Sequence, residues 1–484
     1  MRQKNSFVRS VQSLCARAQA HTLEGTLIYI YIYLQINDDL TRGSAAIACR
    51  RFKGTHSHDR IAEFLENINT DFGISYRKIV ATVTDNGANF VKCFKEFGIT
   101  APNEEDDNQD EEIQMITMDD EENLALVIPE IPKEPLFSLP NHLRCASHTL
   151  NLVATTDAAK ALKNSLFSKL NHAVMGKCSA LWNAAGKPKS SEIVNSVIGQ
   201  QLRYPCVTRW NSMYDSVLQI HQLGKKLNSL MQEVKLPVFK ENELEFIEEY
   251  ILVMKPIAVA LDKLQEEETC YYGCLIPTLL VTKEALLTCE ANNMQLRYCL
   301  PLLKAVLSGY EARFQKFLDL DPSVMDAILA SVSHPYFKLR WVSLAKGGKC
   351  DSTEEVKSQL KIYLQASVRK ITSLDVEMEE KCSDSGEDDF FKSLEGSSLT
   401  LHNKEDLETL NYFQDPSKNV SSLLKYPYVL RVFKQYNTPL PSSAPVERLF
   451  SFAGMINNPK RTRLSDKKFE HLVLLKANLK LNEI

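Results

Sequence analysis

The first hundred residues alternate between apolar runs and polar breaks in a pattern that predicts a mixed sheet. Residues 27–36 (LIYIYIYLQI) are aromatic and β-branched, which is typical of a buried strand. Residues 44–49 predict a second strand, joined to the first as a hairpin across the polar segment 37–43. Residues 58–72 place apolar side chains at helical spacing, and residues 78–84 are again β-branched. This order predicts the front half of a mixed α/β sheet.

From about residue 156 to residue 420, the apolar positions follow mostly helical spacing. The clearest examples are residues 162–174, 213–231, 243–264, 276–287 and 302–318. Few strand signals interrupt this region. We therefore expect a large all-α insertion after the predicted strands.

Three polar segments predict flexible chain. Residues 104–122 hold eleven acids and no Lys or Arg, which indicates a solvated loop over about 101–135. Residues 374–408 are acidic and Ser-rich and predict a second linker within the helical insertion. Residues 1–26 predict an unstructured or truncated N-terminus; a transit peptide is the alternative, because residues 1–23 are basic and lack acids.

The last part of the chain, residues 437–479, carries the pattern of two helices. Ser442 and Ser443 before Pro445 predict the start of the first, because Pro is tolerated in a first turn whose amides lack intrahelical partners. Ser465 can cap the second. The apolar faces of the two helices comprise Val446, Leu449, Phe450 and Ala453, and Phe469, Leu472, Val473 and Leu479.

Two carboxylates stand where functional sites are commonly built. Asp85 ends an apolar strand, and side chains at strand ends leave the sheet and reach solvent. A local Asx-turn with the following Asn86 and Gly87 is the alternative interpretation. Glu447 lies beside the apolar face of the first C-terminal helix. The alternative there is an acid stabilised by the helix dipole and the free amides of the first turn.

Three further groups are candidates for contact with nucleic acid. Cys145 and His148 form a C-x-x-H pair; a buried Cys beside a helix-start His is the alternative, and the spacing is too short for a zinc site. Arg209 offers a planar fork for phosphate and Trp210 a surface for base stacking, although a Trp also fits a core. The densest basic cluster near the chain end comprises Lys460, Arg461, Arg463, Lys467 and Lys468, which could contact the DNA backbone. The alternative interpretation is a solvated turn between two helices.

These segments together resemble one protein family. SSAPVERLFSFAG, followed by a basic turn and L-S-x-x-x-x-E-x-L-V-L-L-K, is similar to the C-terminal dimerisation region of hAT-superfamily transposases. TVTDNGANF resembles the motif that holds the family's second catalytic acid. Residues 144–148 resemble its C-x-x-H motif, and TRWNS resembles its Arg-Trp motif. The resemblance covers about residues 27–480.

The resemblance implies a fold, a site and an interface. The fold would be α/β, a ribonuclease-H-like mixed sheet interrupted by a large all-α insertion: a core from residues 27–155 and 421–484 around a helical insertion at 156–420. Asp85 and Glu447 would be catalytic, metal-holding acids for Mg²⁺-dependent cleavage and transfer of DNA strands. Cys145, His148, Arg209 and Trp210 would contact DNA. Self-association would use Leu449, Phe450, Phe469, Leu472 and Val473.

The chain departs from the family pattern in two places. The first acid, expected on the first strand in an Asp-x-Trp context, is missing; Glu24 is the only nearby carboxylate that could substitute for it. The family's N-terminal BED zinc finger is also absent. Losing one of three ligands removes the geometry that two metal ions need, so we expect the two remaining acids to be vestigial.

Charge and cysteine content bear on how the protein could bind DNA and in which compartment it resides. Net charge is −4, so nucleic-acid binding would depend on local basic patches. The twelve Cys and the lack of a secretory signal predict reduced thiols in a cytosolic or nuclear protein, and the C-x3-C pair Cys270 and Cys274 lacks the partners of a zinc finger. No apolar run reaches membrane-spanning length, so we expect no membrane contact.

The combined interpretation is a transposable-element-derived nuclear protein, catalytically inactive, that dimerises or forms a higher oligomer and retains some DNA binding. No cofactor is expected unless the protein is active, in which case it is Mg²⁺. The first alternative is an active DNA transposase represented by an N-terminally incomplete chain. The second is a pure protein-interaction scaffold.

Overall fold

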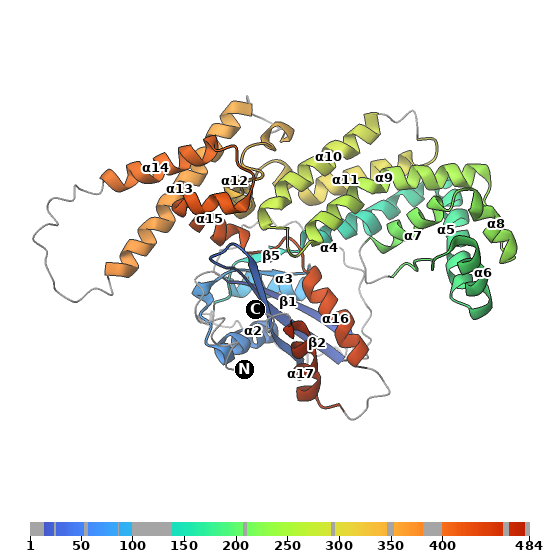
Figure 1. Cartoon of the computed structure of the whole chain (residues 1–484), viewed down its shortest axis with the longest axis horizontal. Coiled ribbons are helices and arrows are strands. Elements are labelled where there is room, and N and C mark those ends of the chain that lie inside the picture. The colour runs from blue at the N-terminus through green and yellow to red at the C-terminus, as the bar shows by residue number, and fades with distance from the viewer. Residues whose placement is uncertain are drawn as a thin grey trace, which may run out of the picture.

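The computed structural model describes residues 14–23, 26–52, 57–85, 87–98, 138–206, 211–291, 296–345, 353–380, 399–457 and 464–479. The chain is a mixed α/β protein: one five-stranded sheet, with helices on both of its faces, lies below a broad body of helices (Figure 1). Chain segments from both ends build the sheet and its cover, whereas the middle of the chain builds the helical body.

The sheet has the strand order β3-β2-β1-β4-β5. The first three strands pair antiparallel, and β4 pairs parallel with both β1 and β5. In the β1–β4 ladder, Ala16 lies opposite Thr82 and Arg17 opposite Val83. The strands are β1 (Leu14–Leu23), β2 (Thr26–Ile36), β3 (Arg42–Arg51), β4 (Ile79–Thr84) and β5 (His142–Arg144).

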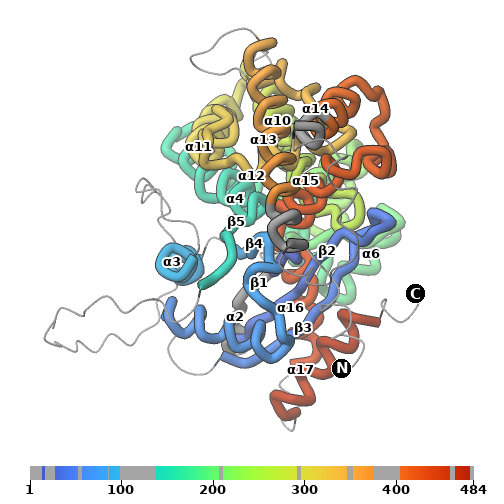
Figure 2. Tube along the Cα trace, turned by 90° about the vertical axis from the view of Figure 1, so that its left-hand side faces the viewer, coloured from blue at the N-terminus to red at the C-terminus, as the bar shows by residue number. Residues whose placement is uncertain are grey.

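Alternation along β2 supplies both faces of the sheet with apolar side chains. Tyr29, Tyr31 and Tyr33 face one way, into a core with α2 (His58–Phe72) and α3 (Ala88–Phe97). The intervening Ile28, Ile30 and Ile32 face α16 (Ala444–Ile456) and α17 (Asp466–Ala477). Figure 2 shows the helices on either side of the strands. The C-terminal helices therefore complete the core that the N-terminal strands begin.

Most of the predicted elements of the sheet region are confirmed. The hairpin is β2 and β3, the helix at 58–72 is α2, and the strand at 78–84 is β4. Gly73 ends α2 with a φ of 64°, a left-handed conformation that glycine adopts without strain. The prediction differs at β1, which lies within the stretch 1–26 that we expected to be unstructured or truncated. Its Ala, Arg, Gln and His residues carry little strand propensity, and pairing with β2 and β4 decides their conformation.

The middle of the chain is helical, as predicted. Its α-helices are α4 (Ala146–Leu152), α5 (Ser165–Ala185), α6 (Pro188–Ile198), α7 (Ser212–Gln222), α8 (Lys225–Glu233), α9 (Glu241–Gln265), α10 (Leu275–Ala291), α11 (Leu300–Leu318), α12 (Met325–Ser333), α13 (Thr353–Glu380), α14 (Leu399–Gln414) and α15 (Pro427–Asn437). Short turns of 3₁₀- or π-helix join several of them: η1 (Tyr76–Lys78), η2 (Val153–Asp157), η3 (Ala158–Lys163), η4 (Tyr272–Cys274), η6 (Pro322–Val324), η7 (Val342–Leu344) and η9 (Val420–Lys425).

Three boundaries differ from the predictions. The helical pattern at 213–231 is two helices, because Gly224 with a φ of 52° separates α7 from α8. The predicted linker at 374–408 is helical at both ends, where α13 and α14 enter it. The segment 421–484 was assigned to the sheet domain, yet α15 packs on α12 and α13 of the helical body. The acidic loop at 101–135 lies outside the described residues.

One helix is apolar and long enough to span a membrane by composition alone, although no run in the sequence suggested it. It covers Tyr272–Ala291, and half of the qualifying window is buried in the fold. Leu275, Ile276 and Leu279 are among its fully enclosed side chains. A helix that is apolar on nearly all sides is what the centre of a large helical body requires.

Candidate functional site

Cys145 joins the end of β4 to the start of α16. Its backbone N–H donates to the carbonyl of Thr84 at 2.9 Å. Its Sγ accepts from the backbone N–H and from the hydroxyl of Ser443, both at 3.2 Å. The next residue, Ala146, donates to the carbonyl of Pro441 at 2.9 Å. Residues about 300 positions apart are therefore held together by one buried thiol.

Glu447 lies one helical turn beyond Ser443, to whose carbonyl its own backbone N–H donates at 3.3 Å. It is in the first turn of α16, as the alternative interpretation requires. Its carboxylate also acts on Cys145: burial raises the pKa of this thiol, hydrogen bonds from Ser443 lower it, and the charge of Glu447 raises it further. Glu447 therefore faces the same junction as Cys145.

Asp85 follows Thr84 directly at the end of β4 and is half-buried. Its Oδ1 accepts from the N–H of Gly87 at 3.3 Å, which is the Asx-turn that local chemistry alone predicts. Thr84, its neighbour, bonds to Cys145. Cys145 thus bonds to the neighbour of Asp85 and senses the charge of Glu447, although these two acids are 362 positions apart in the sequence.

The strand next to Asp85 contributes no carboxylate to this junction. In β1, Arg17 is the register partner of Val83, two residues before Asp85. None of the residues Leu14–Leu23 is Asp or Glu. The first acid of the family pattern is therefore also missing from β1, the strand that we did not predict. Glu24, the substitute we considered, lies outside the described residues.

His142 and His148 have different surroundings. The His142 ring stacks on Phe94 with centroids 4.5 Å apart, and its Nε2 lies 2.8 Å from the hydroxyl of Thr84. Burial lowers the pKa of His142 to about 3, so this ring is neutral and cannot attract a phosphate. His148 is half-buried in the first turn of α4, and its backbone N–H donates to Sγ of Cys145 at 3.3 Å.

Ser443 is the residue whose role the sequence pattern hid. We predicted that it would cap α16, and it does stand at the N-cap position. Its hydroxyl, however, bonds to Cys145 and makes no cap hydrogen bond; the preceding Ser442 accepts from the N–H of Ala444 at 3.2 Å instead. Two serines in a row were the available signal, because one helix start needs only one cap.

Several predicted DNA contacts cannot be placed. Arg209, Trp210, Lys460, Arg461 and Arg463 lie outside the described residues. Their roles stay predictions. Lys467 and Lys468 are exposed in the first turn of α17.

The predicted dimerisation residues divide into two groups. Phe450, Phe469 and Val473 are buried in the core between the sheet and the C-terminal helices, so they are unavailable to a second subunit in this fold. Leu449 is half-buried, and Leu472 is 41% exposed. These three side chains cover the second face of the sheet, which the sequence pattern did not show, and their role in dimerisation stays a prediction.

A group of three potential metal ligands lies elsewhere, between the start of α2 and the end of α3. Nε2 of His58 is 2.8 Å from Glu96 and 3.3 Å from Asp59. Both distances suit hydrogen bonds or ion pairs of a protonated imidazole, and both carboxylates are exposed. This group is separate from Asp85 and Glu447.

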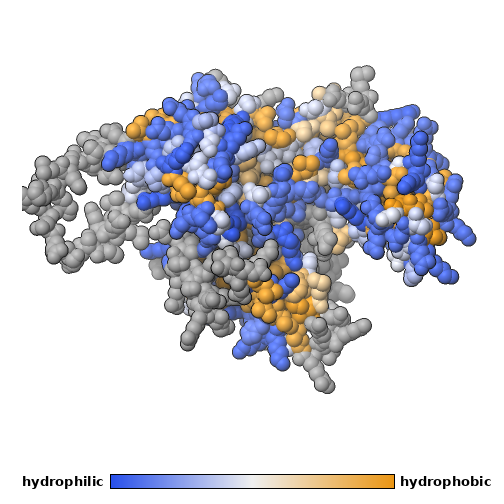
Figure 3. Space-filling view, in the orientation of Figure 1, coloured by the Kyte–Doolittle hydropathy of each residue, from blue (hydrophilic) through white to orange (hydrophobic). Residues whose placement is uncertain are grey.

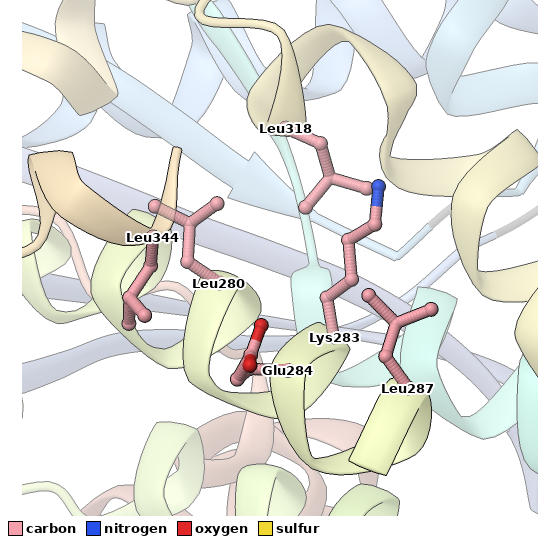
Figure 4. Close-up of a pocket in the computed structure, with 6 residues that line it drawn as sticks. All are labelled: Leu280, Lys283, Glu284, Leu287, Leu318 and Leu344. Carbon is pink, nitrogen blue, oxygen red and sulfur yellow. The ribbon is translucent and has the colours of Figure 1, made fainter. Parts of the chain in front are cut away.

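Two small cavities lie in the described part of the chain, and neither is at the junction of Asp85 and Glu447. The cavity in Figure 4, of about 40 Å³, lies in the helical body, where leucines of α10, α11 and η7 surround Lys283 and Glu284. The other, of about 120 Å³, lies between Ile28 and Phe469. Ligand pockets usually measure at least ~300 Å³, so neither fits a substrate.

No family model and no curated protein matches this chain. The resemblance to hAT transposases therefore rests on the motifs and on what the geometry adds to them.

Proposed function

We propose that this chain is a hAT-transposase-derived protein with a ribonuclease-H-like core that has lost strand-cleavage activity. The observation that supports it best is the junction at Cys145: its backbone N–H bonds to Thr84, the neighbour of Asp85, and the charge of Glu447 acts on its thiol, whereas β1 brings no acid. An arrangement with two acids of an expected three is what a degenerate metal site predicts.

The sheet supports the proposed core. The resemblance implies a mixed sheet, and the chain has one mixed sheet of five strands with helices on both faces. The helical body enters between β5 and α16, at the place where the motifs put an insertion. Asp85 also stands at a strand end, the edge where open α/β sheets build their sites.

We expect purified protein to leave supercoiled DNA intact in the presence of Mg²⁺ or Mn²⁺. Two carboxylates cannot hold both ions in the geometry that in-line displacement needs. Nicking is measured on agarose gels, with Asp85→Asn and Glu447→Gln as matched controls that should equal the parent protein. Robust nicking that Asp85→Asn removes would favour the alternative, an active transposase.

Self-association is the second part of the proposed function. With three predicted contacts buried, the exposed apolar side chains of the C-terminal helices are Leu472, Leu475 and Leu479, at 41%, 59% and 47%, and Met455 of α16 at 69%. Leu472 and Leu475 are spaced i and i+3 and share one face of α17, and Leu479 lies just beyond the end of this helix. Figure 3 shows an apolar area over α16 and α17.

We expect Leu475→Glu to convert the oligomer to monomer, with at least a tenfold weaker association, because it buries a charge in an apolar contact. Light scattering over a concentration series measures this. Leu407→Glu in α14 is the matched control, since Leu407 is also 59% exposed and lies in the helical body. A parent protein that is monomeric at every concentration would refute the proposed self-association.

Residual DNA binding in the nucleus is the third part. Its support is the basic cluster around residues 460–468 and the exposed Lys467 and Lys468. Phosphate contacts release counterions, so binding should weaken steeply with salt. A gel-shift titration that shows no binding at any salt concentration would instead favour a protein-interaction scaffold.

A further inference from the structure

Arg42 lies where the sheet meets the helical body, and its guanidinium donates to backbone carbonyls of the helical body. Its Nη1 donates to the carbonyl of Thr438 at 2.7 Å, and its Nη2 to the carbonyls of Cys270 and Asn437, both at 3.2 Å. Its buried Nε has no hydrogen-bond partner. Among the described residues it forms no ion pair with a carboxylate. Burying a cation costs free energy that neutral acceptors offset only in part, so an anion near Arg42 would stabilise it.

The ionisable groups around this guanidinium are thiols and a phenol. Tyr271 lies under it, with its ring centroid 5.0 Å from Cζ. Cys15, Cys270 and Cys274 lie close enough for their ionised forms to raise the pKa of Arg42, which burial lowers. Cys15 and Cys270 are buried, and Cys274 is half-buried. A thiolate is therefore the anion that this site can supply.

Cys274 is the thiol best placed to ionise. Its Sγ accepts from the backbone N–H of Tyr271 at 3.3 Å. A hydrogen bond from Cys270, this amide and the charge of Arg42 lower the pKa of Cys274, while burial and Glu266 act in the opposite direction. Glu266 is paired with Lys263 at 3.0 Å, which offsets its charge. Both thiols therefore lie against the backbone of Tyr271, since Sγ of Cys270 donates to the carbonyl of Tyr271 at 3.6 Å.

We propose that Cys270 and Cys274 form a dithiol site that hydroperoxides oxidise to a disulfide. The Cys274 thiolate attacks one peroxide oxygen, the O–O bond breaks, and the leaving oxygen takes a proton to become water or an alcohol. The resulting sulfenic acid is then attacked by the sulfur of Cys270. The S–O bond breaks, and the hydroxide leaves as water with the Cys270 proton. Two thiols and one hydroperoxide thus yield one disulfide.

The backbone is compatible with this bond. Cys274 closes η4, its N–H donating to the carbonyl of Tyr271 at 2.9 Å, and its Sγ accepts from the N–H of Tyr271, the amide that follows Cys270 directly. The sulfur of Cys270 lies beside the same residue, 3.6 Å from the carbonyl oxygen of Tyr271. Disulfides span Cα separations of about 4.4–6.8 Å. Closure therefore requires rotation of the side chains and little movement of the backbone.

The test uses the full-length reduced protein treated with about one equivalent of hydrogen peroxide at pH 7, followed by alkylation, trypsin and mass spectrometry. Cleavage after Lys263 and Lys283 yields a peptide that holds Cys270 and Cys274 and no other cysteine. We expect this peptide to lose two hydrogens and to escape alkylation. Exposed Cys206, in a separate peptide, serves as the internal standard.

We expect Cys274 to react about tenfold faster than Cys206, because an ordinary thiol is only a few per cent ionised at pH 7. Cys270→Ser should leave a sulfenic acid at Cys274 that dimedone traps, and Cys289→Ser should change nothing. Equal rates at Cys206 and Cys274, or oxidation without the 270–274 bond, would overturn the proposal. If a variant does not fold, the ratio of the oxidation rates of Cys274 and Cys206 in the parent protein still tests the proposal.

Discussion

Gly309→Ala is expected to destabilise the protein by about 3 kcal/mol, whereas Gly176→Ala should be neutral or stabilise it by up to about 1 kcal/mol. Both glycines lie inside helices, α11 and α5, where Ala is intrinsically preferred. Helix propensity alone therefore predicts the same small gain at both positions. The expected results differ in sign because the two glycines have different neighbours.

A Cβ at Gly309 would lie 2.4 Å from Cβ of Asp157 and 2.6 Å from its Oδ2. Asp157 cannot move aside freely, because it is buried and its carboxylate binds Nε of Arg313 at 2.6 Å and Nζ of Lys160 at 2.7 Å. Separating such a buried pair costs about 3–5 kcal/mol of stability. The higher helix propensity of Ala offsets about 1 kcal/mol of this loss. At Gly176 nothing lies within 4 Å.

Urea unfolding followed by circular dichroism measures both variants on equal terms. A shift of the midpoint without a change of slope would identify a stability effect. If Gly309→Ala were as stable as Gly176→Ala, then α11 would not pack on the Asp157 segment, and the described arrangement of the helical body would be wrong.

Lowering the pH from 7 to 5 is expected to destabilise the protein by about 4 kcal/mol through two histidines. Burial lowers the pKa of His142 to about 3 and that of His334 to about 4. The ring of His142 lies between Phe94 and Thr84. Nδ1 of His334 accepts from the backbone N–H of Tyr336 at 3.2 Å, a bond that protonation of this atom would break.

The direction follows from proton uptake. An unfolded chain protonates each imidazole near its ordinary pKa of about 6.5, whereas the folded chain keeps it neutral down to about pH 4. Between these values the unfolded state binds more protons, so stability falls as the pH falls. Each histidine contributes up to about 1.4 kcal/mol per pH unit, and stability is fully present above about pH 6.5.

Unfolding free energies measured between pH 5 and pH 7 check this prediction, together with NMR titration of the imidazoles. His142→Phe keeps the stack on Phe94 and should remove about half of the pH dependence. His172→Gln should leave the slope unchanged, since His172 is exposed on α5. Folded-state pKa values near 6.5 at both histidines would contradict the expected enclosure.

Local pattern predicted the elements whose signals are strong over a short range. Helix α2 matches its prediction at both ends because two local signals indicate the same boundaries. The apolar spacing runs over residues 58–72, and Gly73 suits the left-handed conformation that ends the helix. Strand β1 could not be predicted, because its polar and small residues become a strand only by pairing with two neighbours. Likewise, the break between α7 and α8 rests on a single Gly224.

The candidate site was predictable only through family resemblance. Asp85 and Glu447 each have an ordinary local explanation, and the structure shows that both local explanations hold. What periodicity could not indicate is that Cys145 links the end of β4 to the start of α16, because hydrogen bonds between residues 145 and 443 leave no trace in the pattern. The buried positions of Phe450, Phe469 and Val473 were hidden for the same reason.

By itself, the sequence determined most of the strands and helices, though not β1, and it showed that the middle of the chain is helical and that no acid precedes Glu24. These properties depend on neighbouring residues or on composition. Only the tertiary structure decided that α16 and α17 cover the sheet, that Asp85 and Glu447 share a neighbour, and that Arg42 meets a pair of thiols. The reason is physical: apolar burial has no direction, so a helix face shows that it must be covered but not what covers it.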